Sequence, residues 1–178
     1  MELEGKNLGI IGMGRIGQSL AKKAYHGFGM NVTYSSRSLS TKNGNQFKRV
    51  EFQELLQSSD IVSLNTDLNP STKHLIGAKE LELMKTSAYL INTSRGEIID
   101  QEALVHSLKT GGIKGAGLDV TSPEPLPSSH PLFQLSNTII TPHIGSATKE
   151  ARDQMAGLAA KNIIAGLKGL PLLARPSY

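Results

Sequence analysis

The stretch Leu8–Gly17, which reads LGIIGMGRIG, decides the fold class of this chain. Its first four residues form an apolar run that predicts a buried strand, and a helical pattern follows over residues 18–25. The intervening G-x-G-x-x-G pattern in a strand–turn–helix context favours a dinucleotide-binding turn over an ordinary glycine-rich turn. In such a site Gly12 permits the tight turn, Gly14 lets the backbone approach a pyrophosphate, and Gly17 lets helix and strand pack closely.

Short apolar runs continue to alternate with helical patterns along the chain. Further strands are predicted over residues 30–34, 61–64, 88–91, 113–120 and 138–140. Further helices are predicted over residues 52–57, 78–84, 101–109 and 146 to about 167. This alternation predicts an α/β fold, a doubly wound parallel sheet with helices on both faces, which binds ligands at the carboxyl ends of its strands. We expect a dinucleotide-binding domain over residues 1–145, and a C-terminal helix and tail over residues 146–178.

Composition narrows the class of protein. The chain has 178 residues, 38% of them apolar and 19% charged, which favours one compact domain. The net charge of +4 could suggest nucleic-acid binding, but the chain lacks Trp and the aromatic–basic interleaving of a nucleic-acid surface. A mildly basic surface, or attraction to an anionic cofactor, is the favoured interpretation. The absence of Cys excludes disulfides and thiol catalysis. No apolar run approaches the roughly 20 residues of a membrane span, and no secretory signal follows Met1, so we expect a cytoplasmic protein.

The residues after the second predicted strand bear on cofactor choice. An NAD site normally has an acid here that bonds the ribose hydroxyls, but no Asp or Glu stands between Glu4 and Glu51. The segment instead contains Ser36, Arg37 and Ser38. A guanidinium can bind a 2′-phosphate in bidentate fashion, so the sequence favours NADP(H), with NAD(H) possible and with Arg37 as a solvated loop residue the alternative. We expect no carboxylate close enough to oppose this phosphate.

Three further polar residues suit the reduction of a keto acid. Arg95 follows a predicted strand, Glu124 stands between prolines, and His143 follows the last predicted strand. Taken singly, a surface ion pair, a solvated carboxylate and a structural histidine are the ordinary interpretations. Taken together, they supply a cation that polarises a carbonyl, an imidazole that donates a proton, and a carboxylate that orients the imidazole. The histidines show no metal-ligand spacing, so no metal site is expected.

Four segments resemble the D-isomer-specific 2-hydroxyacid dehydrogenase family: LGIIGMGRIGQ, NTSRGEIIDQEAL, GAGLDVTSPEPLP and TPHIGSAT. The resemblance implies that Arg95 contacts substrate, that His143 is the acid/base, and that Glu124 is its partner. It also implies three groups of contacts: Gly14, Arg15 and Ile16 with the pyrophosphate, Thr93, Asp119 and Gly145 around the nicotinamide, and Ser146 beside the substrate. Residues 65–70 are expected to flank the adenine, although Asp67 stands where relatives often have Pro or Ser.

The resemblance also predicts the reaction and the assembly. It implies reduction of a small 2-keto acid, glyoxylate or hydroxypyruvate, by a homodimer. Arg37 adds the expectation that the cofactor is NADP(H), and the composition adds the expectation that the protein engages neither nucleic acid nor membrane. The family carries a substrate-binding half mostly before the fingerprint, whereas eleven residues precede Gly12 here. We therefore expect this chain to correspond to the cofactor-binding portion, with its last helix returning to the substrate half. A non-catalytic dinucleotide sensor or corepressor-like module on the same fold is the alternative.

Overall fold

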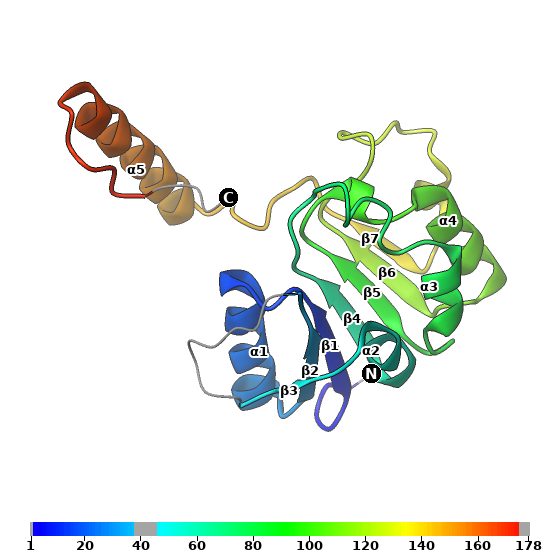
Figure 1. Cartoon of the computed structure of the whole chain (residues 1–178). Helices are drawn as coiled ribbons and strands as arrows, with labels where there is room; N and C mark the ends of the chain where they lie inside the picture. Colours follow the sequence, from blue (N-terminus) through cyan, green and yellow to red (C-terminus); the bar gives the residue numbers. More distant parts are fainter. Residues whose placement is uncertain (1, 38–45, 175–178) are drawn as a thin grey trace. The chain divides into compact units, whose positions relative to one another are not determined.

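The computed structural model describes residues 2–37 and 46–174, which fall into two compact units. Met1–Pro142 forms the first unit and His143–Tyr178 the second. The first unit contains a sheet of seven strands in the order β3-β2-β1-β4-β5-β6-β7, and every pair is parallel (Figure 1). The strands are β1 Asn7–Ile11, β2 Asn31–Ser35, β3 Lys48–Arg49, β4 Ile61–Leu64, β5 Tyr89–Asn92, β6 Gly115–Leu118 and β7 Thr138–Ile140. The doubly wound parallel sheet predicted from the sequence is confirmed.

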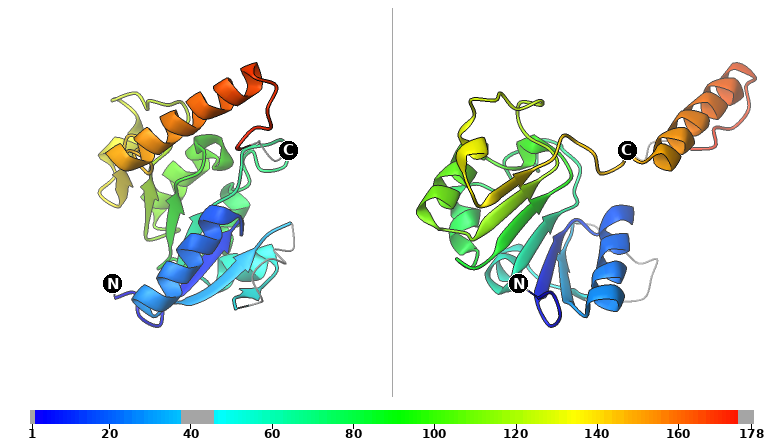
Figure 2. Two further views of the ribbon diagram at one scale, coloured as in Figure 1. Left: turned by 90° about the vertical axis from the view of Figure 1, so that its left-hand side faces the viewer. Right: turned by 180° about the vertical axis from the view of Figure 1, so that it is seen from behind.

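Helices cover the two faces of this sheet because the strand order changes direction. The helices of the first unit are α1 Arg15–Phe28, α2 Phe52–Ser58, α3 Ala78–Leu83 and α4 Gln101–Thr110, and two short 3₁₀ turns are η1 Gly96–Ile98 and η2 Pro131–Gln134. From β1 the chain moves outward to β2 and β3, then crosses back to β4 and continues outward to β7. Right-handed crossovers in opposite directions place helices on opposite faces. Accordingly α1 lies on one face and α2, α3 and α4 lie on the other (Figures 1 and 2).

Each face has its own apolar core. On the α1 side, Ile10, Ala21 and Ala24 are buried in a cluster that α1 shares with β1 and β2. On the other side, a larger cluster joins α2, α3 and α4 to the sheet, and Leu55 and Leu90 are fully buried within it. Burial of apolar area at about 25 cal/mol per Å² makes these two clusters the main source of stability of the first unit. These clusters cover the faces of the sheet, so the connecting loops lie at the ends of the strands.

The sheet has its switch point between β1 and β4, where the two directions of winding diverge. Here the first residues after β1 and β4 are bonded to the last residues of the neighbouring strands. The Gly12 N–H donates to the Ser35 carbonyl at 2.9 Å, and the Asn65 N–H donates to the Ile11 carbonyl at 2.7 Å. Chains that leave neighbouring strands toward opposite faces open a crevice at this edge of a sheet. The fold therefore places a candidate site at the carboxyl ends of β1, β2 and β4.

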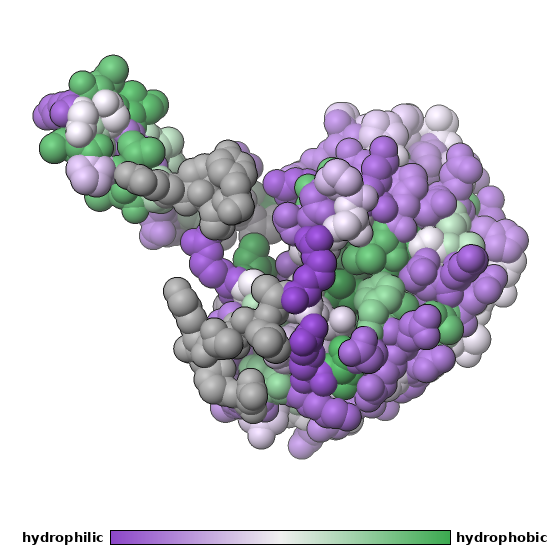
Figure 3. Space-filling model, in the orientation of Figure 1, coloured by the Kyte–Doolittle hydropathy of each residue, from purple (hydrophilic) through white to green (hydrophobic). Residues whose placement is uncertain are grey.

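The second unit consists mainly of α5, Lys149–Leu167. The Thr148 hydroxyl caps this helix by accepting the Ala151 N–H at 3.1 Å, so the helix begins three residues later than the predicted start at Ser146. The tail folds back onto α5, because the Asn162 amide donates to the Ala174 carbonyl at 2.8 Å. Figure 3 shows polar and apolar residues mixed over α5, and its exposed apolar side chains are Met155, Leu158, Ile163, Ile164 and Leu167. Among the described residues, none of the helices has the length and apolarity needed to cross a membrane.

Candidate functional site at the carboxyl edge of the sheet

The turn between β1 and α1 needs its three glycines for different reasons. Gly12 has a φ of 95°, and a Cβ there would lie 2.5 Å from the Asn65 carbonyl oxygen. A Cβ on Gly17 would collide with the backbone carbonyl of Gly12, so the third glycine lets α1 pack against the turn. A Cβ on Gly14 would meet nothing within 4 Å. Gly14 therefore borders open space, and this space is where the fingerprint needs room for a ligand.

The amino end of α1 faces this open space with its backbone N–H groups. Within the part of the chain that the structure describes, no side chain caps this end, and the first turn contains no acidic residue. A helix of 14 residues presents partial positive charge at its amino end. Uncapped N–H groups together with that dipole form an anion-binding site, and Arg15 adds a full positive charge in the first turn. A pyrophosphate fits this end of the helix.

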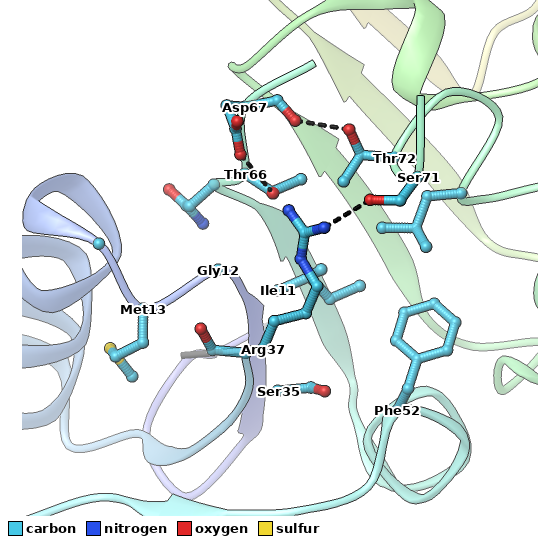
Figure 4. A pocket seen from close by; sticks show the side chains of 14 residues that line it. Ile11, Gly12, Met13, Ser35, Arg37, Phe52, Thr66, Asp67, Ser71 and Thr72 are labelled. Atoms are coloured by element: carbon cyan, nitrogen blue, oxygen red, sulfur yellow. Dashed lines mark hydrogen bonds between the residues drawn. The ribbon is translucent and has the colours of Figure 1, made fainter. Parts of the chain in front are cut away.

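Three adjoining cavities form a crevice along the carboxyl edge. The first has a volume of about 620 Å³ and contains the Gly12–Gly14 turn, Ser35–Arg37 and Asn65–Asp67 (Figure 4). The second, about 690 Å³, lies over the start of α1 and shares Gly14 and Asn65 with the first. The third, about 400 Å³, shares Ile16 with the second and ends at Thr93–Arg95. Asn65 borders all three, so the cavities lie side by side along the edge between Arg37 and Arg95.

Several residues of this crevice were not identified from the sequence. The first cavity is also lined by Phe52, Ser71, Thr72 and Leu75, which come from α2 and from the loop before α3. Phe52 is the first residue of α2, and the other three lie on the stretch of chain between β4 and α3. Their sequence context offers no motif, whereas Gly12, Gly14, Arg15 and Ile16 belong to the fingerprint and do line the crevice.

Two basic residues lie close to the end of β2. The Arg37 Nη1 donates to the Ser71 hydroxyl at 2.5 Å, so the exposed side chain of Arg37 reaches across the first cavity toward the loop after β4 (Figure 4). The Arg49 Nη2, from β3, donates to the Ser36 carbonyl at 2.8 Å. Ser38, which the sequence also places in the phosphate group of residues, lies outside the described residues. The end of β2 therefore offers Arg37 to a ligand, with Arg49 holding the backbone beside it.

The expectation that no carboxylate stands near Arg37 is wrong. Asp67 lines the same cavity, on the facing loop (Figure 4). Its carboxylate accepts a bond from the Asn69 amide at 3.1 Å and one from the Thr66 hydroxyl at 3.4 Å. The Asn69 bond, the backbone N–H of Asp67, the Thr66 hydroxyl and the positive charge of Arg37 together lower the pKa of Asp67. The carboxylate is thus charged at neutral pH, and the pocket carries both signs of charge.

At the far end of the crevice, the loop after β5 carries Thr93 and Arg95. The buried Asn92 side chain fixes this loop by donating to the Arg95 carbonyl at 2.9 Å and accepting the Ser94 N–H at 3.0 Å. Ser94 in turn donates from its hydroxyl to the Leu64 carbonyl at 3.0 Å. The Arg95 side chain is exposed and its Nη1 donates to the Ser94 carbonyl at 2.7 Å. Its guanidinium therefore borders the crevice on a braced backbone.

The loop that carries Glu124 is tied to the loop of Arg95. The Gln101 side chain donates to the Ser122 carbonyl at 2.7 Å and accepts the Ser122 N–H at 3.0 Å. Gly96 contacts the Thr121 carbonyl so closely that a Cβ would have no room. Glu124 lies two residues after Ser122, and its side chain is exposed. The structure thus joins the backbones that carry Arg95 and Glu124.

The remaining predicted residues lie at the ends of the last two strands. Asp119 follows β6 and is buried, and its carboxylate accepts the Thr141 hydroxyl at 2.5 Å. His143, Gly145 and Ser146 belong to the second unit. His143 comes after Thr141 and Pro142, which follow β7, and it has a φ of 54° that is rare for a residue other than glycine. Its geometry relative to Arg95 and Glu124 stays a prediction.

Comparison with known proteins agrees with this architecture. Residues 1–145 match the family model described as D-isomer specific 2-hydroxyacid dehydrogenase, NAD binding domain. The glyoxylate reductase of Thermococcus litoralis is 53% identical over 169 residues, which cover 94% of this chain and 50% of that protein. The glyoxylate/hydroxypyruvate reductase B of an Enterobacter species is 46% identical over 171 residues, covering 95% of this chain and 53% of that protein. The chain therefore spans about half the length of the curated relatives it matches.

Solved structures share the fold and differ in cofactor. The crystal structure of a glyoxylate reductase from Paecilomyes thermophila has a TM-score of 0.91 and 40% identity, covering 98% of this chain and 53% of that chain. A Lactobacillus delbrueckii dehydrogenase in its NAD complexed form (TM-score 0.87, 33% identity) covers 99% of this chain and 56% of its own. An acyclic imino acid reductase in complex with NADPH and D-Arg (TM-score 0.86, 36% identity) covers 97% and 54%. The chain belongs to the D-isomer specific 2-hydroxyacid dehydrogenase family, of which it contains the NAD binding domain.

Proposed function

We propose that this chain binds a nicotinamide dinucleotide along the crevice, with a preference for NADP(H), and that it supplies the cofactor site and the acid–base residues of a 2-keto acid reductase. Glyoxylate and hydroxypyruvate are the proposed substrates, because the relatives that match nearly the whole chain are named for them. The observation that carries the proposal is the row of three adjoining cavities between Arg37 and Arg95, one of which lies over the amino end of α1. A dinucleotide is a long ligand with a charged centre, and the crevice offers a matching series of groups.

Different residues of the crevice would bind different parts of the dinucleotide. The amino end of α1, with Gly14, Arg15 and Ile16, would hold the pyrophosphate. The first cavity would take the adenosine, with Ser36 and Arg37 beside the 2′ position. The third cavity, which ends at Thr93 and Arg95, would receive the nicotinamide end. The fit rests on the open space at Gly14, which a side chain would fill.

The proposed chemistry needs three side chains of this chain. When bound, the reduced nicotinamide supplies the hydride that reduces the carbonyl carbon. The Arg95 guanidinium binds the keto acid and stabilises the charge that develops on its oxygen. His143 donates the proton that this oxygen takes, and a carboxylate at Glu124 orients the imidazole and favours its charged form. Thr93, Asp119, Gly145 and Ser146 are proposed to complete the walls around the reacting groups.

A matched pair of glycine variants tests cofactor binding. Gly14→Val places a branched side chain in the open space at the start of α1, and Gly27→Val places the same side chain in equally open space at the other end of the helix. Neither position has a positive φ, so both variants are expected to fold. Titrations of NADPH and NADH followed by nucleotide fluorescence should show at least about tenfold weaker binding for Gly14→Val, because the valine blocks backbone contact with the pyrophosphate.

The control variant separates the site from general effects on the helix. Gly27→Val should bind both nucleotides as the unmodified chain does, and thermal unfolding should show both variants folded. Equal affinity of Gly14→Val and Gly27→Val for both nucleotides would overturn the proposal that the crevice at α1 binds the pyrophosphate.

A further inference from the structure

The first cavity of the crevice carries opposite charges on two facing loops. Arg37 comes from the end of β2, and Asp67 comes from the loop after β4 (Figure 4). The two residues are thirty positions apart in the sequence and meet here because β2 and β4 flank β1. Arg37 is directed toward the β4 loop, where its guanidinium bonds the Ser71 hydroxyl at 2.5 Å. The Arg37 guanidinium, which a 2′-phosphate would need as its partner, therefore already interacts with groups of the facing loop.

A 2′-phosphate and a 2′-hydroxyl meet this arrangement differently. A phosphate carries close to two negative charges at neutral pH, so the Asp67 carboxylate repels it and competes with it for Arg37. A ribose with a free 2′-hydroxyl meets no such repulsion and can donate a hydrogen bond to the carboxylate. In many NAD sites an acid at the end of the second strand has this role. Here an acid reaches the same cavity from another strand.

We propose that Asp67 is a specificity-determining residue, which weakens binding of the 2′-phosphate at Arg37 and keeps the cavity able to bind NAD(H) as well as NADP(H). This inference rests on the proposed cofactor site and adds a residue that sets its selectivity. Arg37 favours NADP(H) and Asp67 favours NAD(H), so the ratio of the two affinities reflects their balance.

A purely structural role for Asp67 makes a different prediction. Its side chain bonds Asn69 and Thr66, and its backbone carbonyl accepts the Thr72 hydroxyl at 2.7 Å. Asp67→Asn keeps the backbone bond and an oxygen that can accept from Asn69, and it removes only the negative charge. If Asp67 only shapes the loop, this variant binds both nucleotides with an unchanged ratio of affinities.

The test compares dissociation constants of NADPH and NADH for the chain and for Asp67→Asn by isothermal titration calorimetry at low ionic strength. We expect the preference for NADPH over NADH to rise by about three- to tenfold, the effect of one charge acting on a phosphate across a solvated pocket. The rise should shrink in about 0.5 M salt, which screens exposed charges. Glu82→Gln, an equal change of charge on α3 outside the three cavities, should leave the ratio unchanged.

Every outcome of this experiment is informative. An unchanged or smaller preference in Asp67→Asn, with both nucleotides still bound, overturns the role of Asp67 and leaves the cofactor site standing. Failure of the unmodified chain to bind either nucleotide overturns the cofactor site, and this inference with it. If Asp67→Asn unfolds, Asp67→Ser replaces it, because the serine hydroxyl also accepts from Asn69 and the same rise in preference is expected.

Discussion

Arg37, which follows β2, is the residue on which the proposed preference for NADP(H) over NAD(H) depends. The Arg37 guanidinium lines the first cavity from an exposed position and donates to a neutral hydroxyl, that of Ser71. A bond to a serine is readily exchanged for a bond to phosphate, because the phosphate also carries the charge opposite to that of the guanidinium and can accept two parallel bonds from it.

Arg37→Ala should weaken NADPH binding and leave NADH binding nearly unchanged. A charge-assisted contact is worth roughly 1.5–3 kcal/mol, or about tenfold to a hundredfold in affinity, and the presence of Asp67 favours the lower end. Titration of both nucleotides into the chain and the variant measures this. Lys114→Ala, which removes one positive charge at the opposite end of the sheet, is the control and should change neither affinity. Equal losses of both nucleotides in Arg37→Ala would show that Arg37 does not bind the 2′-phosphate.

The sequence could identify Arg37 and could not identify its surroundings. The absence of an acidic residue between Glu4 and Glu51 describes only the residues that are close to Arg37 in the sequence. Asp67 enters the cavity through the strand order, which places β4 beside β1, so only the family resemblance, and no pattern near Arg37, indicated residues 65–70 at this site. The same reason hides Ser71 and Thr72, whose contacts depend on the path of the chain between β4 and α3.

At the scale of elements, apolar periodicity located the strands and helices well. The predicted bounds of β4 and β7 agree with the structure, and α4 ends where Gly111 adopts a φ of 74°. The strand β3 was missed, because Lys48–Arg49 is a polar pair that the sheet recruits by pairing with β2. The helix α1 begins three residues earlier than predicted, since Arg15 and Ile16 belong both to the glycine motif and to the first turn.

The first residue of α4 has a role that its sequence motif did not reveal. Gln101 braces the backbone at Ser122 with two hydrogen bonds, close to a loop that contains four prolines. Gln101→Ala should lower the free energy of unfolding by about 1–3 kcal/mol, because it leaves the Ser122 N–H and carbonyl without these partners. Urea denaturation measures this, with the exposed His106→Ala on the same helix as the control, expected to stay within about 0.5 kcal/mol. Equal stability of the two variants would show that Gln101 does not brace the loop.

At the amino edge of the sheet, Asp60 joins three elements. Its carboxylate accepts the Asn7 N–H at 2.9 Å and pairs with the Lys85 ammonium at 2.8 Å, which links β1, β4 and the loop before β5. Burial raises the pKa of Asp60, but the Asn7 bond and the Lys85 charge outweigh that effect, so the pKa is lowered. The stabilisation is therefore present above the ordinary value of 3.8 and is lost as pH falls through the lower pKa of the folded state.

Asp60→Asn should accordingly cost stability in a pH-dependent way. We expect a loss of about 1–3 kcal/mol at pH 7 that shrinks as the pH falls below the ordinary value of 3.8. Urea denaturation from pH 7 to pH 3 follows the difference. The exposed Lys48–Glu54 pair is the comparison, since Glu54→Gln should cost at most about 0.5–1 kcal/mol. A loss that is constant over this pH range would exclude the charge of Asp60 as its cause.

At the scale of the whole molecule, topology explains why the candidate site lies where it does. Parallel strands bring the loops after β1, β2, β4 and β5 to one edge, and the reversal of winding at β1 and β4 opens the crevice between them. The strand–helix alternation was sufficient to predict this edge. It could not place His143, because the position of the second unit depends on packing that no periodicity specifies.

This chain should bind the cofactor but turn over substrate with a kcat far below that of a typical enzyme. The chain spans about half the length of its curated relatives, and orientation and water exclusion in a closed site contribute several orders of magnitude to rate. NADPH oxidation with hydroxypyruvate, followed by absorbance, should give a kcat far below the typical value of about 10 s⁻¹. A kcat within tenfold of that value would show that this chain alone forms a complete active site.

The central claim, that the crevice at the carboxyl edge holds a nicotinamide dinucleotide, is tested most directly by amide NMR of the isotope-labelled chain titrated with NADPH. If NADPH binds there, the amide signals of Gly12, Gly14, Arg37 and Thr66 move, together with those of the Thr93–Arg95 loop. Signals from the cavity at the opposite end of the sheet, lined by Lys109, Gly111, Lys114 and Ser136, should stay in place. Shifts confined to that opposite cavity, or no shifts at all at millimolar NADPH, would contradict the account.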